Sequence, residues 1–252
     1  MIEILILSLV QGITEFLPIS SSSHLILISD FLDFKNQSLS IDVSLHIGSF
    51  IAVLLYFYKD ILNFFDNKIL FFKIFISSIP LMIIGFFLVE TGFVEKIRNL
   101  KVIAWTTVIF GFLLFLSDKF KLEKNIEKNF TMKSAIFIGL FQVLSLIPGV
   151  SRSGIAITAS RLLNFKRVDA AKISFLLSIP ILGAVSLFGL KNLIFSENSY
   201  FTVSNLIAIF FSFLTSLITI KYFLIYIKKF NLNIFVYYRI LLGLILLAIA
   251  YL

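Results

Sequence analysis

The stretch TEFLPISSSSH, residues 14–24, places a carboxylate, four serine hydroxyls and an imidazole in an otherwise apolar part of the chain. A hydroxyl beside a base can act as a nucleophile, and an imidazole can attack an electrophile itself. Because His24 follows Ser21 by three residues and Ser20 by four, a helix here would bring the imidazole close to a serine hydroxyl. We therefore interpret Glu15, Ser21 and His24 as candidate catalytic residues, with either Ser21 or His24 as the nucleophile.

A second polar segment, PGVSRSG at residues 148–154, centres on Arg152. A guanidinium can bind two phosphate oxygens at once and can stabilise charge on a transferring phosphoryl group, so Arg152 is a fourth candidate catalytic residue. Serines beside it add hydroxyl donors, and glycines allow close backbone approach. These candidate substrate-binding residues are Gly149, Ser151, Ser153 and Gly154. The alternative interpretation is a purely structural ion pair between Arg152 and Glu15.

Gln11 and Glu15 are four residues apart, so they would share one face of a helix. Their oxygens suit a hard divalent cation, Mg²⁺ or Ca²⁺, which would neutralise phosphate charge. Two other interpretations of Glu15 remain open. It could act as the general base for a nucleophile, or it could only cap or pair locally.

The composition indicates a membrane protein. The 252-residue chain is 59% hydrophobic and 14% charged, with a mean hydropathy of +1.03, whereas a typical soluble domain has about 25% charged residues. Apolar stretches recur along the whole chain, so we expect one integral membrane domain over residues 1–252. The net charge of +8 comes from basic residues in short connections, which argues against nucleic-acid binding and is typical of charges that orient membrane proteins.

Six segments are long and apolar enough to cross a bilayer as helices of about 20 residues. They are 41–58, 74–90, 101–118, 168–190, 201–220 and 234–252. Residues 2–34 and 134–165 are instead interrupted, by Pro18 with its serines and by Pro148-Gly149. Their pieces are too short to cross, so we predict two re-entrant helix pairs, each entering and leaving on one side. The predicted fold class is an all-α polytopic membrane protein.

Both interruptions should present helix N-termini to the protein interior. Serines Ser20–Ser23 follow Pro18, and Ser151 or Ser153 follows Pro148, and serine is a preferred N-cap residue. A helix N-terminus has free N–H groups and a partial positive charge that bind phosphate readily. Two such ends suit a group with more than one negative charge, such as a diphosphate. Ser20 and Ser22 are therefore added to Gln11 as candidate substrate-binding residues.

The charges in the connections predict an orientation. Fourteen Lys and Arg residues fall in or beside connections on one side of the predicted topology, and five, including Lys35, fall on the other. The richer side is expected to be cytoplasmic. Six spans and two re-entrant pairs then place both termini outside.

Similar segments recur in the two halves of the chain, approximately residues 1–120 and 131–252. QGITEFLPISSSSH aligns with QVLSLIPGVSRSG with one gap, and DVSLHIGSFIAV aligns with DAAKISFLLSIP. Because the predicted re-entrant pairs enter from opposite sides, the halves would form inverted-topology repeats with a site near the bilayer midplane. His46, within DVSLHIGSF, has no polar neighbours like those of His24, and we interpret it as a packing or loop residue.

Together these segments resemble the undecaprenyl-diphosphate phosphatases, the bacitracin-resistance family. QGITEFLPISSSSH, IDVSLHIGSFIAVLLYF and LIPGVSRSG followed by SFLLSIP match in order over essentially the whole chain. The resemblance implies a metal-dependent enzyme of the bacterial plasma membrane that hydrolyses undecaprenyl diphosphate to undecaprenyl phosphate and inorganic phosphate, with its site facing outward. Within that family's motifs, the implied site residues are Gln11 and Glu15, catalytic Ser21 and His24, and phosphate-binding Ser151 and Arg152.

The expected partners are therefore a polyprenyl diphosphate and the membrane, with a homodimer as an alternative to a monomer and no nucleic acid. The runner-up function is a transporter or flippase of lipid phosphate, which inverted repeats also favour. An acid-phosphatase-like lipid phosphatase needs two histidines and a downstream basic motif, whereas both histidines here precede residue 50. A purely structural multi-pass protein is the remaining alternative.

Overall fold

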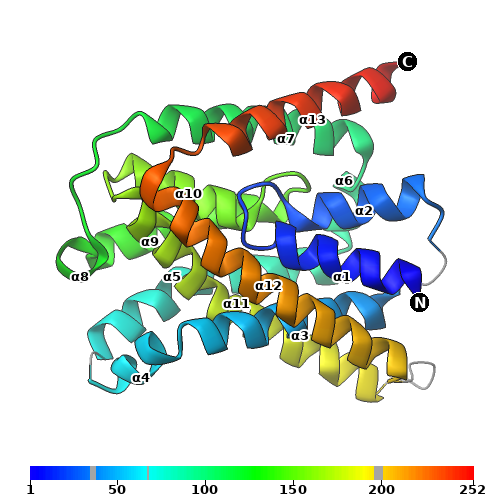
Figure 1. Ribbon diagram of the computed structural model, residues 1–252, viewed down its shortest axis with the longest axis horizontal. Coiled ribbons are helices and arrows are strands. Elements are labelled where there is room, and N and C mark those ends of the chain that lie inside the picture. The colour runs from blue at the N-terminus through cyan, green and yellow to red at the C-terminus, as the bar shows by residue number, and fades with distance from the viewer. Residues whose placement is uncertain (35–37, 67, 196–200) are drawn as a thin grey trace.

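Long apolar helices form most of the computed structural model, which describes residues 1–34, 38–66, 68–195 and 201–252. Six helices are long and apolar enough to cross a membrane (Figure 1). They are α3 (Leu39–Tyr56), α5 (Lys68–Glu90), α7 (Leu100–Asp118), α11 (Arg167–Phe195), α12 (Val203–Lys229) and α13 (Asn233–Tyr251). The six predicted spans are confirmed, and the chain is a multi-pass membrane protein.

Shorter helices lie on either side of the two predicted interruptions. The first break separates α1 (Ile2–Thr14) from α2 (Ser21–Phe31). The second separates α9 (Met132–Val143) and the 3₁₀ turn η1 (Leu144–Leu146) from α10 (Arg152–Leu162). Three further helices lie in connections: α4 (Tyr58–Asp66), α6 (Phe93–Ile97) and α8 (Ile126–Asn129). Every named element in the described ranges is helical, which confirms the all-α class.

Several details differ from the sequence-based expectations. Helix α5 begins at Lys68 rather than near residue 74, so Lys68 and Lys73 lie within a helix. Helix α12 continues to Lys229 rather than ending near residue 220, because KYFLIYI prolongs its apolar face. Lys221 therefore lies within a helix and not in a connection. Lys35, counted among the charges of the opposite side, lies outside the described residues.

Small and hydroxyl-bearing residues allow the helices to pack closely. Gly12 of α1 lies against α12, where an added Cβ would come within 1.8 Å of Thr215 Oγ1. The Ser49 hydroxyl of α3 lies 3.2 Å from that of Ser212 and 3.0 Å from that of Ser216, both on α12. Such contacts are typical of membrane helices, where lipid gives no hydrophobic drive for association and close van der Waals packing replaces it.

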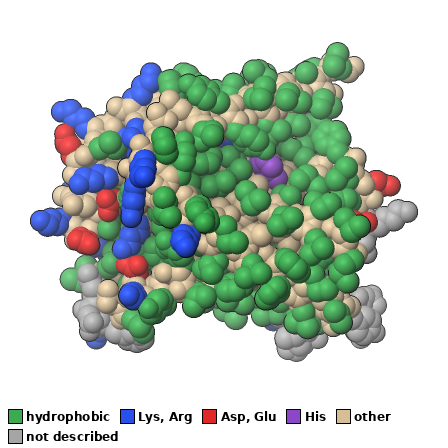
Figure 2. Space-filling model, in the orientation of Figure 1, with side chains coloured by type: hydrophobic (Ala, Val, Ile, Leu, Met, Phe, Trp, Pro, Cys, Tyr) green, Lys and Arg blue, Asp and Glu red, His purple; other side chains and the backbone are tan. Residues whose placement is uncertain are grey.

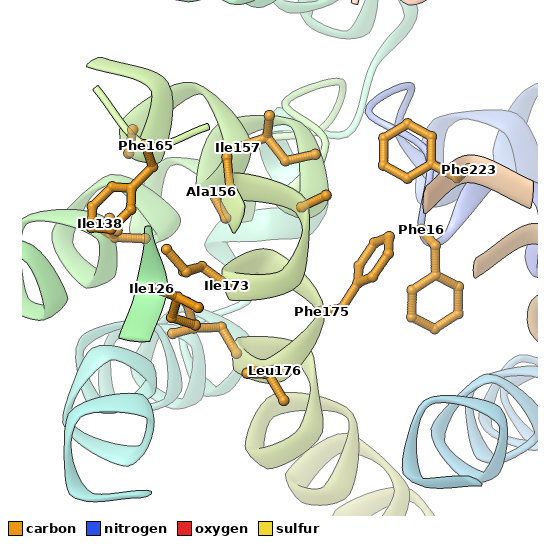
Figure 3. Packing of buried hydrophobic residues seen from close by; sticks show 14 of the residues in the cluster. Phe16, Ile126, Ile138, Ala156, Ile157, Phe165, Ile173, Phe175, Leu176 and Phe223 are labelled. Carbon is orange, nitrogen blue, oxygen red and sulfur yellow. The ribbon is translucent and has the colours of Figure 1, made fainter. Parts of the chain in front are cut away.

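An aromatic cluster forms the centre of the apolar core. Phe16, from the first break, packs edge-on against Phe175 of α11 with ring centroids 5.4 Å apart (Figure 3). Phe175 in turn contacts Phe223 of α12 at 5.8 Å. Phe16 and Phe175 are fully buried. Edge-to-face ring pairs add specific geometry to apolar burial, so the core fixes the first break against two spanning helices.

A buried polar cluster joins helices α7, α10 and α11 and the loop before α13. Asp118, at the end of α7, accepts hydrogen bonds from Arg161 Nε at 3.3 Å and Arg167 Nε at 2.7 Å. Its second oxygen accepts from the backbone N–H of Leu232, which leads into α13. Arg161 is fully buried and also donates to backbone carbonyls, including that of Phe120. This Asp118 cluster ties the ends of α7, α10 and α11 to the loop before α13.

The surface shows how charge and apolar residues are divided. Lys and Arg side chains gather at the end of the molecule where α8 lies, while hydrophobic side chains cover the middle (Figure 2). Both chain termini lie at the opposite end (Figure 1). The termini and the basic end are thus separated by the apolar band that contacts lipid.

This arrangement predicts that the basic end and the C-terminus lie on opposite sides of the membrane. The chain has no cysteine, so Lys121→Cys and Leu252→Cys each create one thiol at an exposed position. In sealed vesicles of uniform orientation, a membrane-impermeant maleimide should label only one of the two variants. The other should react only after permeabilisation. Labelling of both variants in sealed vesicles would contradict the arrangement.

Candidate active site

The break between α1 and α2 brings Glu15 and Ser21 together. The Ser21 hydroxyl donates a hydrogen bond to Glu15 Oε2 at 2.6 Å, and Gln11 Nε2 donates to the same oxygen at 3.1 Å. Glu15 directly follows α1 and is only 6% exposed. The predicted shared face of Gln11 and Glu15 is confirmed. A serine hydroxyl that already donates to a buried carboxylate has the arrangement needed for activation by a general base.

The second break places Arg152 against this pair. Ser151 is the N-cap of α10, and its hydroxyl accepts from the backbone N–H of Gly154 at 3.1 Å. Arg152 is the first residue of the helix, and its Nη2 donates to Glu15 Oε1 at 2.8 Å. The Ser153 hydroxyl adds a second bridge by donating to the Leu17 carbonyl at 2.7 Å. The two breaks therefore meet, as the sequence predicted.

The ion pair between Glu15 and Arg152 leaves one donor unused. Arg152 Nη1 is buried and has no hydrogen-bond partner among the described residues. A buried unpaired donor of this kind is costly and unusual, so it requires an explanation, such as a ligand. The structural ion pair considered as an alternative does form, but it occupies only one of the two terminal nitrogens. The guanidinium can therefore hold Glu15 and an anion at the same time.

His24 has partners other than those expected. Its Nδ1 donates to the backbone carbonyl of Ser20 at 2.7 Å, and the Tyr238 hydroxyl of α13 lies 2.6 Å from its Nε2. Both ring nitrogens are thus engaged away from the serine hydroxyls, and the expected Ser–His hydrogen bond is not formed. The reason is that Ser21 is the first residue of α2, where its side chain points back to Glu15.

A cavity of about 510 Å³ opens beside these residues. Its polar wall comes from both breaks and from two other residues: Glu15, Ser20, Ser21, Ser22, His46, Ser145, Ser151 and Arg152. Its apolar wall comes chiefly from α5 and α11: Leu81, Met82, Phe86, Val89, Ile181, Leu182, Val185 and Phe188. One cavity therefore combines a charged, hydroxyl-rich wall with a long apolar wall.

Some of the predicted substrate-binding residues do not line this cavity. Gly149 has a φ of +94° and lies against α7, where an added Cβ would come within 1.9 Å of Thr106 Oγ1. The Ser153 hydroxyl and the Gly154 N–H are already bonded within or between the breaks. Gln11 lies beneath Glu15, fully buried. In this structure these residues shape and support the breaks.

His46 corrects the sequence-based interpretation. It was expected to be a packing or loop residue, but it lies on the cavity wall with Glu15 and Ser21. Its Nδ1 donates to the Asp42 carbonyl one turn earlier at 2.7 Å. His46 belongs to IDVSLHIGSFIAVLLYF, one of the segments that resemble the phosphatase family, and that resemblance was the signal that could have identified it. Nothing in its immediate neighbours indicated a polar cavity, because the cavity forms between distant helices.

Few protein oxygen atoms are available here to bind a divalent cation. Gln11 Oε1 is buried without a hydrogen-bond partner in the described ranges, and Glu15 supplies a carboxylate. The described residues contain no group of three or more His, Cys, Asp or Glu side chains that could hold a metal. Mg²⁺ commonly uses one or two carboxylates together with substrate phosphates and water. Of these two residues, Glu15 lines the cavity and could share a cation with a phosphate ligand there, whereas Gln11 does not line it.

Six apolar spans and an internal site for an anionic group beside an apolar wall define a polytopic membrane protein suited to an amphipathic anionic ligand. The chain belongs to the family described as bacitracin resistance protein BacA, whose model matches residues 4–245. It is 51% identical to an undecaprenyl-diphosphatase of Pelagibacter ubique (strain HTCC1062) over 99% of this chain and 98% of that protein. It is 43% identical to an undecaprenyl-diphosphatase of Saccharophagus degradans (strain 2-40 / ATCC 43961 / DSM 17024) over 94% of this chain and 93% of that protein.

The spare donor of Arg152 predicts that inorganic pyrophosphate stabilises the folded protein. A ligand that binds only the folded state adds about 2.7 kcal/mol at 100 times its Kd, so the melting temperature in detergent should rise. Arg152→Gln should lose most of this shift because it removes the donor. Lys121→Gln, a charge change at an exposed position outside the cavity, should retain it. An equal shift in the Arg152→Gln variant would contradict the assignment of the anion site.

Proposed function

We propose that the chain is a membrane phosphatase that hydrolyses undecaprenyl diphosphate to undecaprenyl phosphate and inorganic phosphate. Its family and the name shared by its curated relatives support this activity. The observation that carries the proposal is the meeting of Glu15, Ser21 and Arg152 on the polar wall of a cavity whose other wall is apolar. This activity supplies the monophosphate form of the lipid carrier used in cell-wall synthesis.

The two walls match the two parts of this substrate. A prenyl chain is entirely apolar, and the side chains of α5 and α11 give it a surface of like polarity inside the membrane region. The diphosphate would lie against the N-terminal ends of α2 and α10, where backbone N–H groups and helix dipoles favour negative charge. The spare Nη1 of Arg152 adds a charged donor.

Ser21 is the nucleophile favoured by this geometry. Its hydroxyl lines the cavity and donates to Glu15, whereas both nitrogens of His24 are bonded elsewhere. In the first step Ser21 Oγ bonds to the terminal phosphorus while its proton passes to Glu15. The bond between that phosphorus and the bridging oxygen breaks, and prenyl phosphate leaves with the bridging oxygen. Arg152 stabilises the charge that develops on the transferring group.

The second step restores the enzyme. Once Glu15 has passed the Ser21 proton to the departing prenyl phosphate, a water molecule attacks the phosphoserine. Glu15 accepts a proton from that water, and the bond between phosphorus and Ser21 Oγ breaks. Ser21 recovers a proton and inorganic phosphate is released. His24 then has a supporting role, because its Nδ1 holds the Ser20 carbonyl at the start of α2. His46 also lines the cavity and would contact the diphosphate.

A divalent cation, Mg²⁺ or Ca²⁺, belongs to this proposal. Glu15 and Gln11 Oε1 would hold it together with phosphate oxygens, and it would neutralise part of the diphosphate charge. Glu15 would then serve both the cation and the Ser21 proton. Its carboxylate has two oxygens with several acceptor positions, which permits both contacts.

The membrane arrangement that we infer follows from the same features. The short lengths of α1, α2, α9 and α10 support two re-entrant pairs, and the matching breaks support inverted repeats. The basic end would face the cytoplasm of a bacterial plasma membrane. Both termini would then lie outside, and the cavity would open toward the outer side.

Phosphate release is the test of catalysis. The purified protein in detergent, with no second compartment, should release phosphate from a prenyl diphosphate, which a transporter would not do. Ser21→Ala removes the nucleophile and Arg152→Ala removes the charged donor, so each should lower kcat by about 1,000-fold or more. Ser29→Ala makes the same change two turns further along α2, outside the cavity wall, and should remain near wild type. Full activity of either site variant would overturn the proposal.

Removal of divalent cations should abolish phosphate release, and excess Mg²⁺ or Ca²⁺ should restore it. Gln11→Leu removes one of the two protein oxygens, so it should raise the cation concentration needed for half-maximal activity several-fold. Ser29→Ala should leave that concentration unchanged. Undiminished activity in excess chelator would exclude the cation from the reaction.

A further inference from the structure

Arg239 of α13 is a buried arginine that hydrogen-bonds to both breaks. It is 1% exposed, and its Nη1 donates to the Pro18 carbonyl at 3.3 Å. Its Nη2 donates to the Gly149 carbonyl at 2.9 Å, and its Nε donates to the Thr107 carbonyl of α7 at 3.2 Å. Within the described part of the chain, no carboxylate forms an ion pair with it. A charge buried at this cost needs a reason.

Two of the three carbonyls that Arg239 binds, those of Pro18 and Gly149, are ones that a broken helix leaves without N–H partners. Pro18 and Gly149 both lie between helices, and Gly149 has a positive φ of 94°. Inside a membrane protein an unbonded carbonyl is costly, because no lipid group can donate a hydrogen bond to it. The Thr106 hydroxyl of α7 satisfies the neighbouring Pro148 carbonyl at 2.6 Å. Helices α7 and α13 therefore supply donors to the breaks from behind the cavity.

The register of these contacts is the same in both breaks. Pro18 lies three residues before Ser21, and Gly149 lies three residues before Arg152. A guanidinium is a rigid planar fork, so binding both carbonyls fixes the position of one break relative to the other. The adjacent Tyr238 strengthens the arrangement, since its hydroxyl contacts His24, which in turn holds the Ser20 carbonyl.

We propose that Arg239 is a positioning residue for phosphoryl transfer, which holds Ser21 and Arg152 in register by binding the backbone of both breaks. It does not line the cavity, so it acts through the breaks and not on the substrate. This inference rests on the proposed phosphatase function. It assigns a role in that reaction to a residue of the last helix, far from both motifs in the sequence.

The variant Arg239→Lys tests whether the planar shape of the guanidinium matters in addition to its positive charge. Lysine keeps the positive charge, but its compact ammonium cannot span the two carbonyls and Thr107 together. A displacement of about 1 Å of catalytic groups can cost about 100-fold in rate, so kcat per folded protein should fall about 10- to 100-fold. KM should change less than about threefold, because the apolar wall remains intact.

Arg161→Lys is the matched control. Arg161 is equally buried and also donates to backbone carbonyls, but it belongs to the Asp118 cluster and not to the breaks. Both variants should lower the melting temperature. Only Arg239→Lys should lower kcat of the folded fraction. An equal effect of the two variants on kcat would reduce Arg239 to a structural residue and overturn the proposal.

A double-mutant cycle tests whether Arg239 affects kcat through the position of Arg152. If Arg239 acts by placing Arg152, then Arg239→Lys should cause little further loss of kcat in an Arg152→Ala background. Full additivity of the two losses would show that Arg239 acts independently of Arg152, against the proposal.

A distance measurement tests the same inference without enzyme activity. Spin labels on Ile13→Cys and Leu144→Cys, both at exposed positions just before the two breaks, report their separation. Arg239→Lys should broaden or shift this distribution, and Arg161→Lys should not. A wild type that releases no phosphate would refute the phosphatase function alone, while an unchanged distribution in Arg239→Lys would refute the role of Arg239.

Discussion

A helix that breaks within a membrane protein leaves backbone carbonyl and N–H groups that lipid cannot satisfy. The rest of this structure follows from meeting that constraint twice. Ser153 and Arg239 donate to carbonyls of the first break, and Thr106 and Arg239 donate to those of the second. The breaks are therefore held by the body of the protein and by each other, which is why they meet.

The arginines that hold the two breaks also make the protein interior around them positively charged. Among the described residues, Glu15 is the one carboxylate that lies in or is bonded to either break. Arg152 and Arg239 both carry a positive charge there. The N-terminal ends of α2 and α10 add partial positive charge. In a medium of low polarity this excess is expensive unless an anion compensates for it. The interior is thus suited to a negatively charged ligand. The unpaired Nη1 of Arg152 is the atom that lacks a partner.

The apolar wall explains why such an anion belongs to a lipid. A soluble phosphate ester would leave the faces of α5 and α11 exposed to water within the cavity, whereas a prenyl chain covers them. Binding energy from the chain can thereby place the diphosphate against Ser21, far from most of the atoms that supply that energy.

The sequence by itself determined the helical elements and indicated most of the candidate site residues. Apolar length gave six spans, Pro18 and Pro148-Gly149 gave the breaks, and residue type and spacing gave Glu15, Ser21 and Arg152. These inferences depend on local rules, namely helix length, proline geometry and the donor inventory of each side chain. Tertiary structure alone decided the pairing of Ser21 with Glu15 rather than with His24, the place of His46 on the wall, and the contacts of Arg239. Each of these contacts depends on which face a helix turns toward partners up to about 220 residues away in the chain. The packing of the whole helix bundle decides which face that is, and no local sequence pattern encodes this packing.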